Sequence, residues 1–209
     1  FSVSVPILAL QLNHLFARRE EKDIVTHTKH RVCPVTLAGS LDNRIRRWLQ
    51  NPRKILEPYV REGMKVLDIG CGPGFFSIEL AQMVGKSGRV IALDLQEGML
   101  RKLRDKIQGT KIEERITLHK CEKNSFGLSE LVDFALAFYM VHEIPDQERF
   151  LNDIKSVLKP NGQVLIVEPP LHASKKDFEG TIRKAQDKGF VVVDRPKMFP
   201  NKAVILQNG

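Results

Sequence analysis

From about residue 63 onward, short apolar runs rich in β-branched residues alternate with stretches whose apolar positions recur every three or four residues. This alternation is typical of βαβ units around a mainly parallel sheet. We therefore expect an α/β fold whose ligand lies at the carboxyl ends of the strands. The predicted strands of this part are Lys65 to Ile69, Val90 to Asp94, Ile116 to Lys120, Val132 to Phe138 and Gln163 to Val167. The predicted helices are Phe75 to Val84, Glu97 to Gln108, Gln147 to Leu158 and Lys175 to Lys188, and residues 121–131 are predicted to be mostly loop.

The last twenty residues show a different pattern. Two β-branched runs, Phe190 to Asp194 and Lys202 to Gln207, are separated by a proline-containing segment too short for a helical crossover. Strands joined in this way pair antiparallel. The sequence thus predicts seven strands in a mostly parallel sheet with the last one reversed, and helices on both faces.

Residues 1–59 are predicted to form a separate N-terminal helical extension, or cap, ahead of one domain at 60–209. Within it, "SLDNRIRRWLQNPRKILEPYV" has helical periodicity interrupted at Pro52, with Ile45, Trp48 and Leu49 on one face. A chain of 209 residues has room for one such α/β domain and a modest extension. We expect the extension to cover the substrate site.

Composition favours a cytoplasmic protein without a membrane span. Hydrophobic residues make up 42% and charged residues 28% of the chain, and no apolar run reaches the roughly 20 residues that a bilayer span needs. The opening "FSVSVPILALQL" lacks a basic leader and a small-residue cleavage site, so it is not interpreted as a signal peptide. The three cysteines, Cys33, Cys71 and Cys121, are odd in number and share no repeated spacing, which indicates a reducing compartment.

The net charge of +8 is concentrated at one end. Residues 1–59 carry ten Lys or Arg against five Asp or Glu. Such an excess permits a nucleic-acid partner, but it is also common on solvated surfaces. Nucleic acid therefore remains a possible partner that is not favoured.

A glycine-rich turn follows the first predicted strand. In "VLDIGCGPGFFS", Gly70, Gly72 and Gly74 form G-x-G-x-G, one residue shorter than the dinucleotide pattern. Pro73 also removes one backbone N–H from the loop, which makes it a poorer phosphate cradle. The stretch predicts a tight turn that a bulky ligand approaches closely; a plain strand-to-helix turn is the alternative.

Acidic residues accompany the ends of the first three strands. Asp68 lies inside the first strand near the glycine turn, where a carboxylate favours a cationic partner. Asp94 ends the second strand and is placed to accept two ribose hydroxyls, although an aspartate stabilised by a helix dipole is an alternative. Glu122 follows the third strand and is placed to accept from an exocyclic amine, or lies in a solvated loop.

Five blocks, in order and spacing, carry a resemblance: "VLDIGCGPGFFS", "VIALDLQEGML", "ITLHKCEKN", "VDFALAFYMVHEIPD" and "LKPNGQVLIVEP". Over about residues 60–170 the chain resembles the class I S-adenosylmethionine-dependent methyltransferases, and within them the branch of ubiquinone and menaquinone C-methyltransferases. This resemblance implies a Rossmann-like fold, whose reversed seventh strand matches the predicted hairpin.

The resemblance implies S-adenosylmethionine as the cofactor. It places Gly70, Cys71, Gly72 and Gly74 along the methionine part and Asp68 near the ammonium. It assigns the ribose to Asp94, the adenine to Leu95 and Met99, the adenine amine to Glu122, and the vicinity of the sulfonium to Ala137 and Phe138. Lys123 is counted with this set, although it replaces the small apolar neighbour common in the family.

No catalytic base is assigned from the sequence. "FYMVHEIPD" offers Tyr139, His142 and Glu143 after the fourth strand, and a histidine has a pKa suited to a general base. A structural or cofactor-side role for His142, and a pocket or packing role for Tyr139, are the alternatives. Enzymes that methylate base amines carry an Asn/Asp-Pro-Pro-Tyr/Phe tetrapeptide, which this sequence lacks. This argues against a nucleic-acid substrate.

No metal site is predicted. "HTKHRVCP" holds His27, His30 and Cys33 at three-residue intervals, a set that suits zinc or arsenite. Pro34 and the β-branched neighbours argue against a regular helix there, so a polar lid segment is preferred.

The predicted function is methyl transfer from S-adenosylmethionine to a small molecule. The alternatives are an RNA methyltransferase, a non-enzymatic S-adenosylmethionine-binding protein and, last, a nicotinamide-dependent dehydrogenase. The accepting atom and the oligomeric state are not predicted, because pockets in such folds are built from variable loops.

Overall fold

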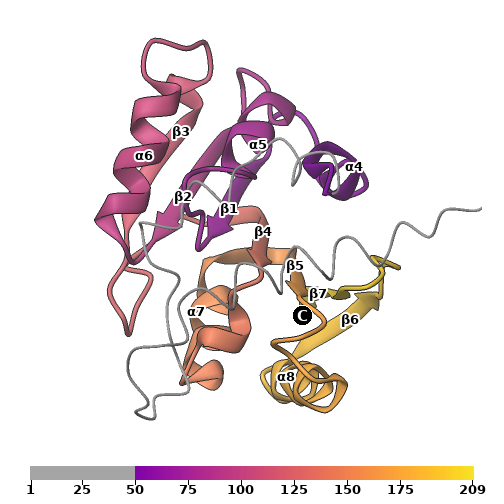
Figure 1. The fold of residues 1–209 in the computed structure, drawn as a ribbon. Coiled ribbons are helices and arrows are strands. Elements are labelled where there is room, and N and C mark those ends of the chain that lie inside the picture. The colour runs from indigo at the N-terminus through magenta and orange to yellow at the C-terminus, as the bar shows by residue number, and fades with distance from the viewer. Residues whose placement is uncertain (1–49) are drawn as a thin grey trace, which may run out of the picture. The chain divides into compact units, whose positions relative to one another are not determined.

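The computed structural model describes residues 50–209, which form a seven-stranded sheet in the order β3-β2-β1-β4-β5-β7-β6 (Figure 1). All neighbouring strands are parallel except that β7 is antiparallel to both β5 and β6. The predicted mostly parallel sheet with a reversed last strand is therefore confirmed. The strands are β1 Lys65–Ile69, β2 Arg89–Asp94, β3 Ile116–Lys120, β4 Val132–Phe138, β5 Leu158–Glu168, β6 Phe190–Asp194 and β7 Lys202–Asn208.

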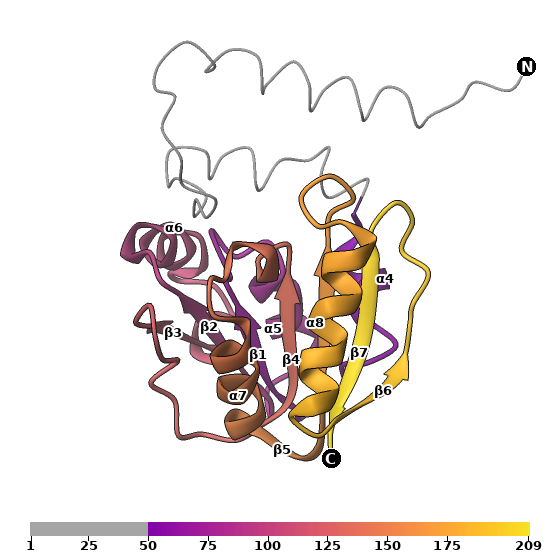
Figure 2. The ribbon, with the colours of Figure 1, turned by 90° about the horizontal axis from the view of Figure 1, so that it is seen from below.

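Helices cover both faces of the sheet, as predicted (Figures 1 and 2). Alternate strand residues pack against α4, α5 and α6 on one face and against α7 and α8 on the other. This division follows from the two-residue period of a strand, since successive side chains point to opposite faces. The helices are α4 Pro52–Leu56, α5 Ser77–Met83, α6 Glu97–Ile107, α7 Gln147–Val157 and α8 Lys175–Asp187, with short 3-10 turns η2 Glu113–Arg115 and η3 Val141–Glu143.

Helix α6 shows how the apolar spacing produces a packed helix. Its buried residues are Met99, Leu100, Leu103 and Ile107, which lie one turn apart along a single stripe. The exposed positions between them are mostly Lys, Arg and Asp. Burial of this stripe against β2 and β3 fixes the helix beside the glycine turn.

Several boundaries differ from the predicted ones. Strand β5 begins at Leu158, because this residue leaves α7 and pairs with Val132 before the register shifts. Helix α5 begins at Ser77 and not at Phe75, since the glycine turn continues through Phe76. The break predicted at Pro52 is the start of α4, whose N-cap Asn51 accepts from the Lys54 N–H. Residues 121–131 are loop, as predicted, apart from one bridge between Glu122 and Ser125.

The predictions for the extension concern mostly residues outside 50–209. The candidate ligands His27, His30 and Cys33 and the apolar face of Ile45, Trp48 and Leu49 lie outside the described residues, as does nearly all of the cap. Within residues 50–209, no helix combines the length and apolar character needed to cross a membrane.

Five loops lie at the carboxyl edge of the parallel strands, namely those that follow β1 to β5. Because β7 is reversed, the loop from β6 into β7 also lies at this edge. Figure 2 shows it next to the segment that leads from β5 into α8. The predicted site residues all lie on or beside these loops.

Candidate functional site

The glycine turn is held against the end of β2 by its backbone. The N–H groups of Gly70 and Cys71 both donate to the Leu93 carbonyl, at 2.8 and 3.0 Å. Gly70, Gly72 and Gly74 have φ of +68°, +54° and +89°. Side chains with a Cβ disfavour this left-handed region. Glycine is thus required for the shape of the turn itself.

The three glycines differ in what surrounds them. A Cβ on Gly72 would meet no atom of residues 50–209 within 4 Å, and one on Gly70 would lie 3.4 Å from Met140 Cγ. A Cβ on Gly74 would lie 2.3 Å from Leu103 Cδ1 of α6. Gly72 therefore borders open space that a ligand can enter, whereas Gly74 lets α6 pack closely on the turn. The methionine-lining role predicted for Gly74 stays a prediction.

Gly74→Ala is expected to lower the free energy of unfolding by about 2–4 kcal/mol, because it combines a left-handed φ with a clash in the core. Gly109→Ala is the matched control: its φ is +72°, but a Cβ there meets nothing within 4 Å. That control should cost only about 1 kcal/mol. Urea denaturation measures both. If the clash is the cause, combining Gly74→Ala with Leu103→Ala gives a loss smaller than the sum of the two, and full additivity would contradict this assignment.

Asp68 and Asp94 are both buried beside this turn. Asp68 accepts a hydrogen bond from Ser77 Oγ at 2.6 Å, and burial raises the pKa of its carboxyl to about 7. Asp94 accepts from the N–H groups of Gly72 and Gln96, at 2.9 and 2.8 Å, and burial raises its pKa as well. Each carboxylate oxygen can accept more than one hydrogen bond, so Asp94 can still accept hydrogen bonds from a ligand.

The other predicted cofactor residues lie in or next to the connections that follow β1, β2 and β3 and at the end of β4. Leu95 is half-buried after β2, and Met99 is buried in the first turns of α6. Glu122 and Lys123 are exposed after β3, and the Glu122 backbone pairs with Ser125. Ala137 and Phe138 are buried at the end of β4. Cys71 is buried in the glycine turn, and burial raises the pKa of its thiol. All of these residues belong to loops or strand ends at one edge of the sheet.

Tyr139 follows β4 in a left-handed conformation, with φ of 60°. Its hydroxyl accepts from Gln50 Nε2 at 2.7 Å and donates to Asn201 Oδ1 at 2.6 Å. A non-glycine residue in this region is uncommon and marks a backbone that its surroundings constrain. The phenol thus joins the segment before α4 to the loop between β6 and β7.

His142 is bound to a buried carboxylate that the sequence predictions missed. Its Nδ1 is hydrogen-bonded to Glu168, which is only 2% exposed at the end of β5 and also accepts from the Val141 N–H at 2.9 Å. Burial lowers the pKa of His142, but the hydrogen bond and charge of Glu168 and the charge of Glu143 outweigh it, so the pKa is raised. Glu168 ends an apolar strand, as Asp94 does. An acidic residue directly after the apolar run in "LIVEP" is the sequence signal that could have identified it.

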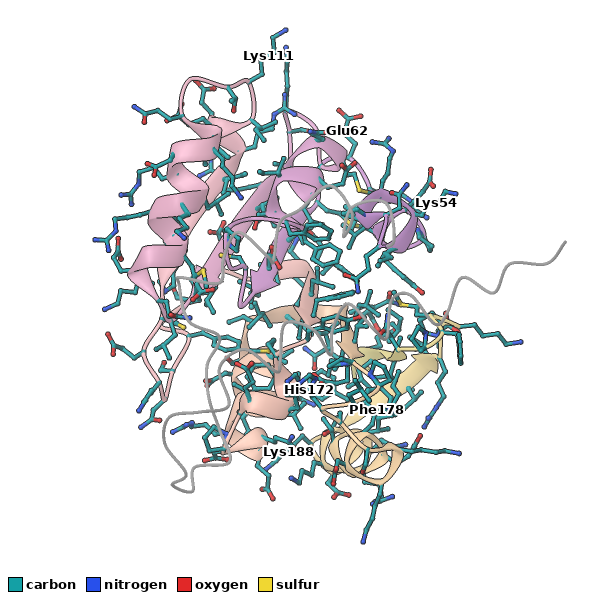
Figure 3. The ribbon with its side chains drawn as sticks, in the orientation of Figure 1. Lys54, Glu62, Lys111, His172, Phe178 and Lys188 are labelled. Atoms are coloured by element: carbon teal, nitrogen blue, oxygen red, sulfur yellow. The ribbon has the colours of Figure 1, made fainter. Side chains whose placement is uncertain are left out.

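Two further groups face His142. Glu143 lies with Oε1 4.0 Å from His142 Nε2; burial, together with the charges of Glu168 and Asp94, raises its pKa, although His142 opposes this. The His172 ring stacks on the His142 ring with 5.5 Å between centroids. His172 lies on the segment that leads from β5 into α8 (Figure 3). The site therefore contains a histidine enclosed by two carboxylates and a second imidazole.

The hydrogen-bond acceptors at this edge fit S-adenosylmethionine. The open side of Gly72 leaves room for a ligand beside Asp94, and carboxylates suit ribose hydroxyls and an ammonium group. Asp68 would hold the ammonium group of the cofactor, and Asp94 would hold its ribose hydroxyls. Among residues 50–209, no group of three or more His, Cys, Asp or Glu side chains is arranged to hold a metal ion.

Comparison with known proteins agrees with this chemistry. Residues 60–195 match a family model described as a methyltransferase domain. A demethylmenaquinone methyltransferase of Lactobacillus johnsonii is 31% identical over 148 residues, 70% of this chain and 56% of that protein. One of Bacillus cereus is 29% identical over 131 residues, 60% of this chain and 52% of that protein. The chain thus spans about half the length of these curated relatives.

The fold is also shared with a solved structure. A SAM-dependent methyltransferase from Aquifex aeolicus superposes with a TM-score of 0.76 and 28% identity, covering 85% of this chain and all of that one. The family match covers well over half of the chain, and the sheet order, glycine turn and acidic strand ends agree with it. The chain belongs to the class I S-adenosylmethionine-dependent methyltransferases, with S-adenosylmethionine as cofactor.

Proposed function

We propose that this protein transfers the methyl group of S-adenosylmethionine to a small-molecule acceptor, with His142 as the group that receives the acceptor's proton. The bound cofactor supplies an electrophilic methyl group on a sulfonium whose leaving group is a neutral thioether. Such a displacement asks the protein to align the acceptor, to exclude water and to remove a proton.

The carboxylates around His142 are the observation that carries the choice of a small molecule. Burial raises the pKa of Glu143, and the charges of Glu168 and Asp94 raise it further, against the opposing effect of His142. A phosphate group brought beside His142 would meet these carboxylates, whereas nucleic-acid sites rely on cationic side chains. The named activity of the curated relatives, methylation of demethylmenaquinone, supports the same choice.

The relatives also suggest an aromatic hydroquinone as the acceptor class. A ring carbon of a hydroquinone becomes more nucleophilic when a ring hydroxyl loses its proton. His142, held by Glu168 and stacked on His172, is a base suited to that proton. Asp68 and Asp94 would orient the methyl donor.

Methyl incorporation tests the proposal. The full chain is incubated with methyl-labelled S-adenosylmethionine and, separately, a short-chain demethylmenaquinol, simple catechols and total RNA. We expect label in an aromatic small molecule and none in RNA. Label in RNA would establish the RNA methyltransferase alternative, and tight binding of S-adenosylhomocysteine without turnover on any acceptor would establish the non-enzymatic one.

A further inference from the structure

Two loops at the carboxyl edge combine positive charge with apolar tips. Residues 169–176, "PPLHASKK", lead from β5 into α8, and residues 195–202, "RPKMFPNK", lead from β6 into β7. Together they contain no Asp or Glu and five cationic residues: Lys175, Lys176, Arg195, Lys197 and Lys202. We call these two segments the paired-loop surface.

The sheet brings the two segments side by side. The β5–β7 ladder ends at the pair Glu168 and Lys202, and Lys202 Nζ donates to the Pro170 carbonyl at 3.5 Å. Leu171 and Phe199 each stand three residues beyond that last pair, one on each segment. Figure 2 shows both segments at the same end of the sheet, beside the start of α8.

The apolar tips are open to solvent. Phe199 is 93% exposed and Leu171 is 64% exposed, the two highest values among the exposed large apolar side chains of residues 50–209. Two exposed apolar side chains on adjoining segments mark an interaction site more often than a single exposed residue does. A partner that buries both of them would recover the free energy of removing them from water.

The charge on this surface is cationic on balance. Arg195 forms a two-fold ion pair with Glu179 of α8, at 2.6 and 3.0 Å, so its charge is largely offset. The nearest acids along the chain are Glu168, Asp177 and Asp194. Glu168 is bound to His142, whereas Asp177 and Asp194 accept hydrogen bonds from neutral groups and keep their charge. Four lysines against the two flanking carboxylates leave the surface cationic.

We propose that the paired-loop surface docks this protein on an anionic lipid bilayer. Phe199 and Leu171 enter the boundary between headgroups and acyl chains, and the surrounding lysines meet lipid phosphates. RNA would satisfy the lysines and stack on Phe199, but it offers no apolar environment for Leu171. The two apolar tips therefore favour a bilayer over RNA.

Docking in this orientation has a consequence for the site. The loop that carries Phe199 also carries Asn201, which accepts the hydrogen bond from Tyr139. The carboxyl edge with His142 and Glu168 would then face the bilayer. This inference goes beyond the proposed function, because it concerns which surface the site faces. It does not depend on which acceptor is methylated.

Vesicle flotation tests the docking. The full chain is mixed with vesicles of phosphatidylcholine, with or without phosphatidylglycerol, over a range of salt. We expect flotation with the anionic vesicles that weakens as salt rises. The pair Leu171→Ser and Phe199→Ser should lower the partition constant at least about tenfold, and the pair Lys175→Glu and Lys197→Glu should do the same.

Matched controls separate this surface from the rest of the chain. Val191→Ser removes another exposed apolar residue, at the opposite end of β6, and Lys111→Glu reverses a lysine beyond α6 (Figure 3). Both should stay within about twofold of the unaltered chain, and all variants should keep their affinity for S-adenosylhomocysteine. Because residues 1–59 are also basic, the comparison between variants assigns the surface.

Three outcomes would overturn the proposal. These are no flotation of the unaltered chain, equal losses in the surface and control variants, and flotation that the surface variants leave unchanged. Retention of an RNA hairpin that the same variants abolish, without flotation, would assign the surface to RNA instead.

Discussion

Asp94→Ala is expected to lower the affinity for S-adenosylhomocysteine by about 100-fold or more. The two ribose hydroxyls of the ligand would lose their hydrogen bonds to the Asp94 carboxylate. Hydrogen bonds to a charged group are worth about 1.5–3 kcal/mol each. The substitution also leaves the N–H groups of Gly72 and Gln96 without the acceptor that shapes the turn. Isothermal titration calorimetry measures the change directly.

Two variants make this result specific. Asp94→Asn keeps one carbonyl oxygen and should bind with intermediate affinity. Asp105→Ala removes an exposed carboxylate from α6 and should bind as the unaltered chain does. Circular dichroism checks that each variant is folded. An Asp94→Ala protein that is folded and binds with unchanged affinity would remove this residue from the cofactor site.

The second large effect concerns His142. His142→Asn is expected to lower kcat by about 100-fold or more, the usual contribution of a positioned general base, with little change in the affinity for the cofactor. The raised pKa of His142 gives the unaltered enzyme an acid limb: the rate is low while the imidazole is protonated and rises as the pH passes through that pKa. Initial rates across pH, at saturating acceptor, measure the limb.

Glu168→Gln shows whether the buried carboxylate acts through His142. Loss of its negative charge removes the larger of the two carboxylate effects that raise the pKa of His142 and leaves that of Glu143, so the acid limb should move to lower pH while the maximal rate falls. Glu148→Gln neutralises an exposed carboxylate on α7 and should leave the limb in place. A Glu168→Gln enzyme with a lower rate and an unmoved limb would reduce Glu168 to a structural role.

Much of the fold could be predicted because its signals are local. The alternation of apolar runs located all seven strands, and the short proline-containing connection identified the reversed one. The glycine turn and Asp94 could be placed for the same reason, since the end of one strand and the start of the next helix determine them. These features depend on neighbours within a few residues.

Contacts between distant parts of the chain could not be predicted. Glu168 lies 26 residues from His142 and reaches it only because β4 and β5 pair in parallel. The close contact of Gly74 with Leu103, and the phenol of Tyr139 between Gln50 and Asn201, are likewise products of packing. The local pattern of apolar and polar residues does not show which residues far apart in the sequence come into contact.

The position of β7 between β5 and β6 also determines the order in which the sheet can be completed. Strand β6 pairs only with β7, and the outer edge of β5 pairs only with β7, although β6 precedes β7 in the chain. During synthesis, therefore, β6 has no partner and β5 keeps an open edge until residues 202–208 have emerged. Open edges of this kind invite pairing with other chains. Until its seventh strand is made, the nascent protein therefore exposes strand edges that favour aggregation.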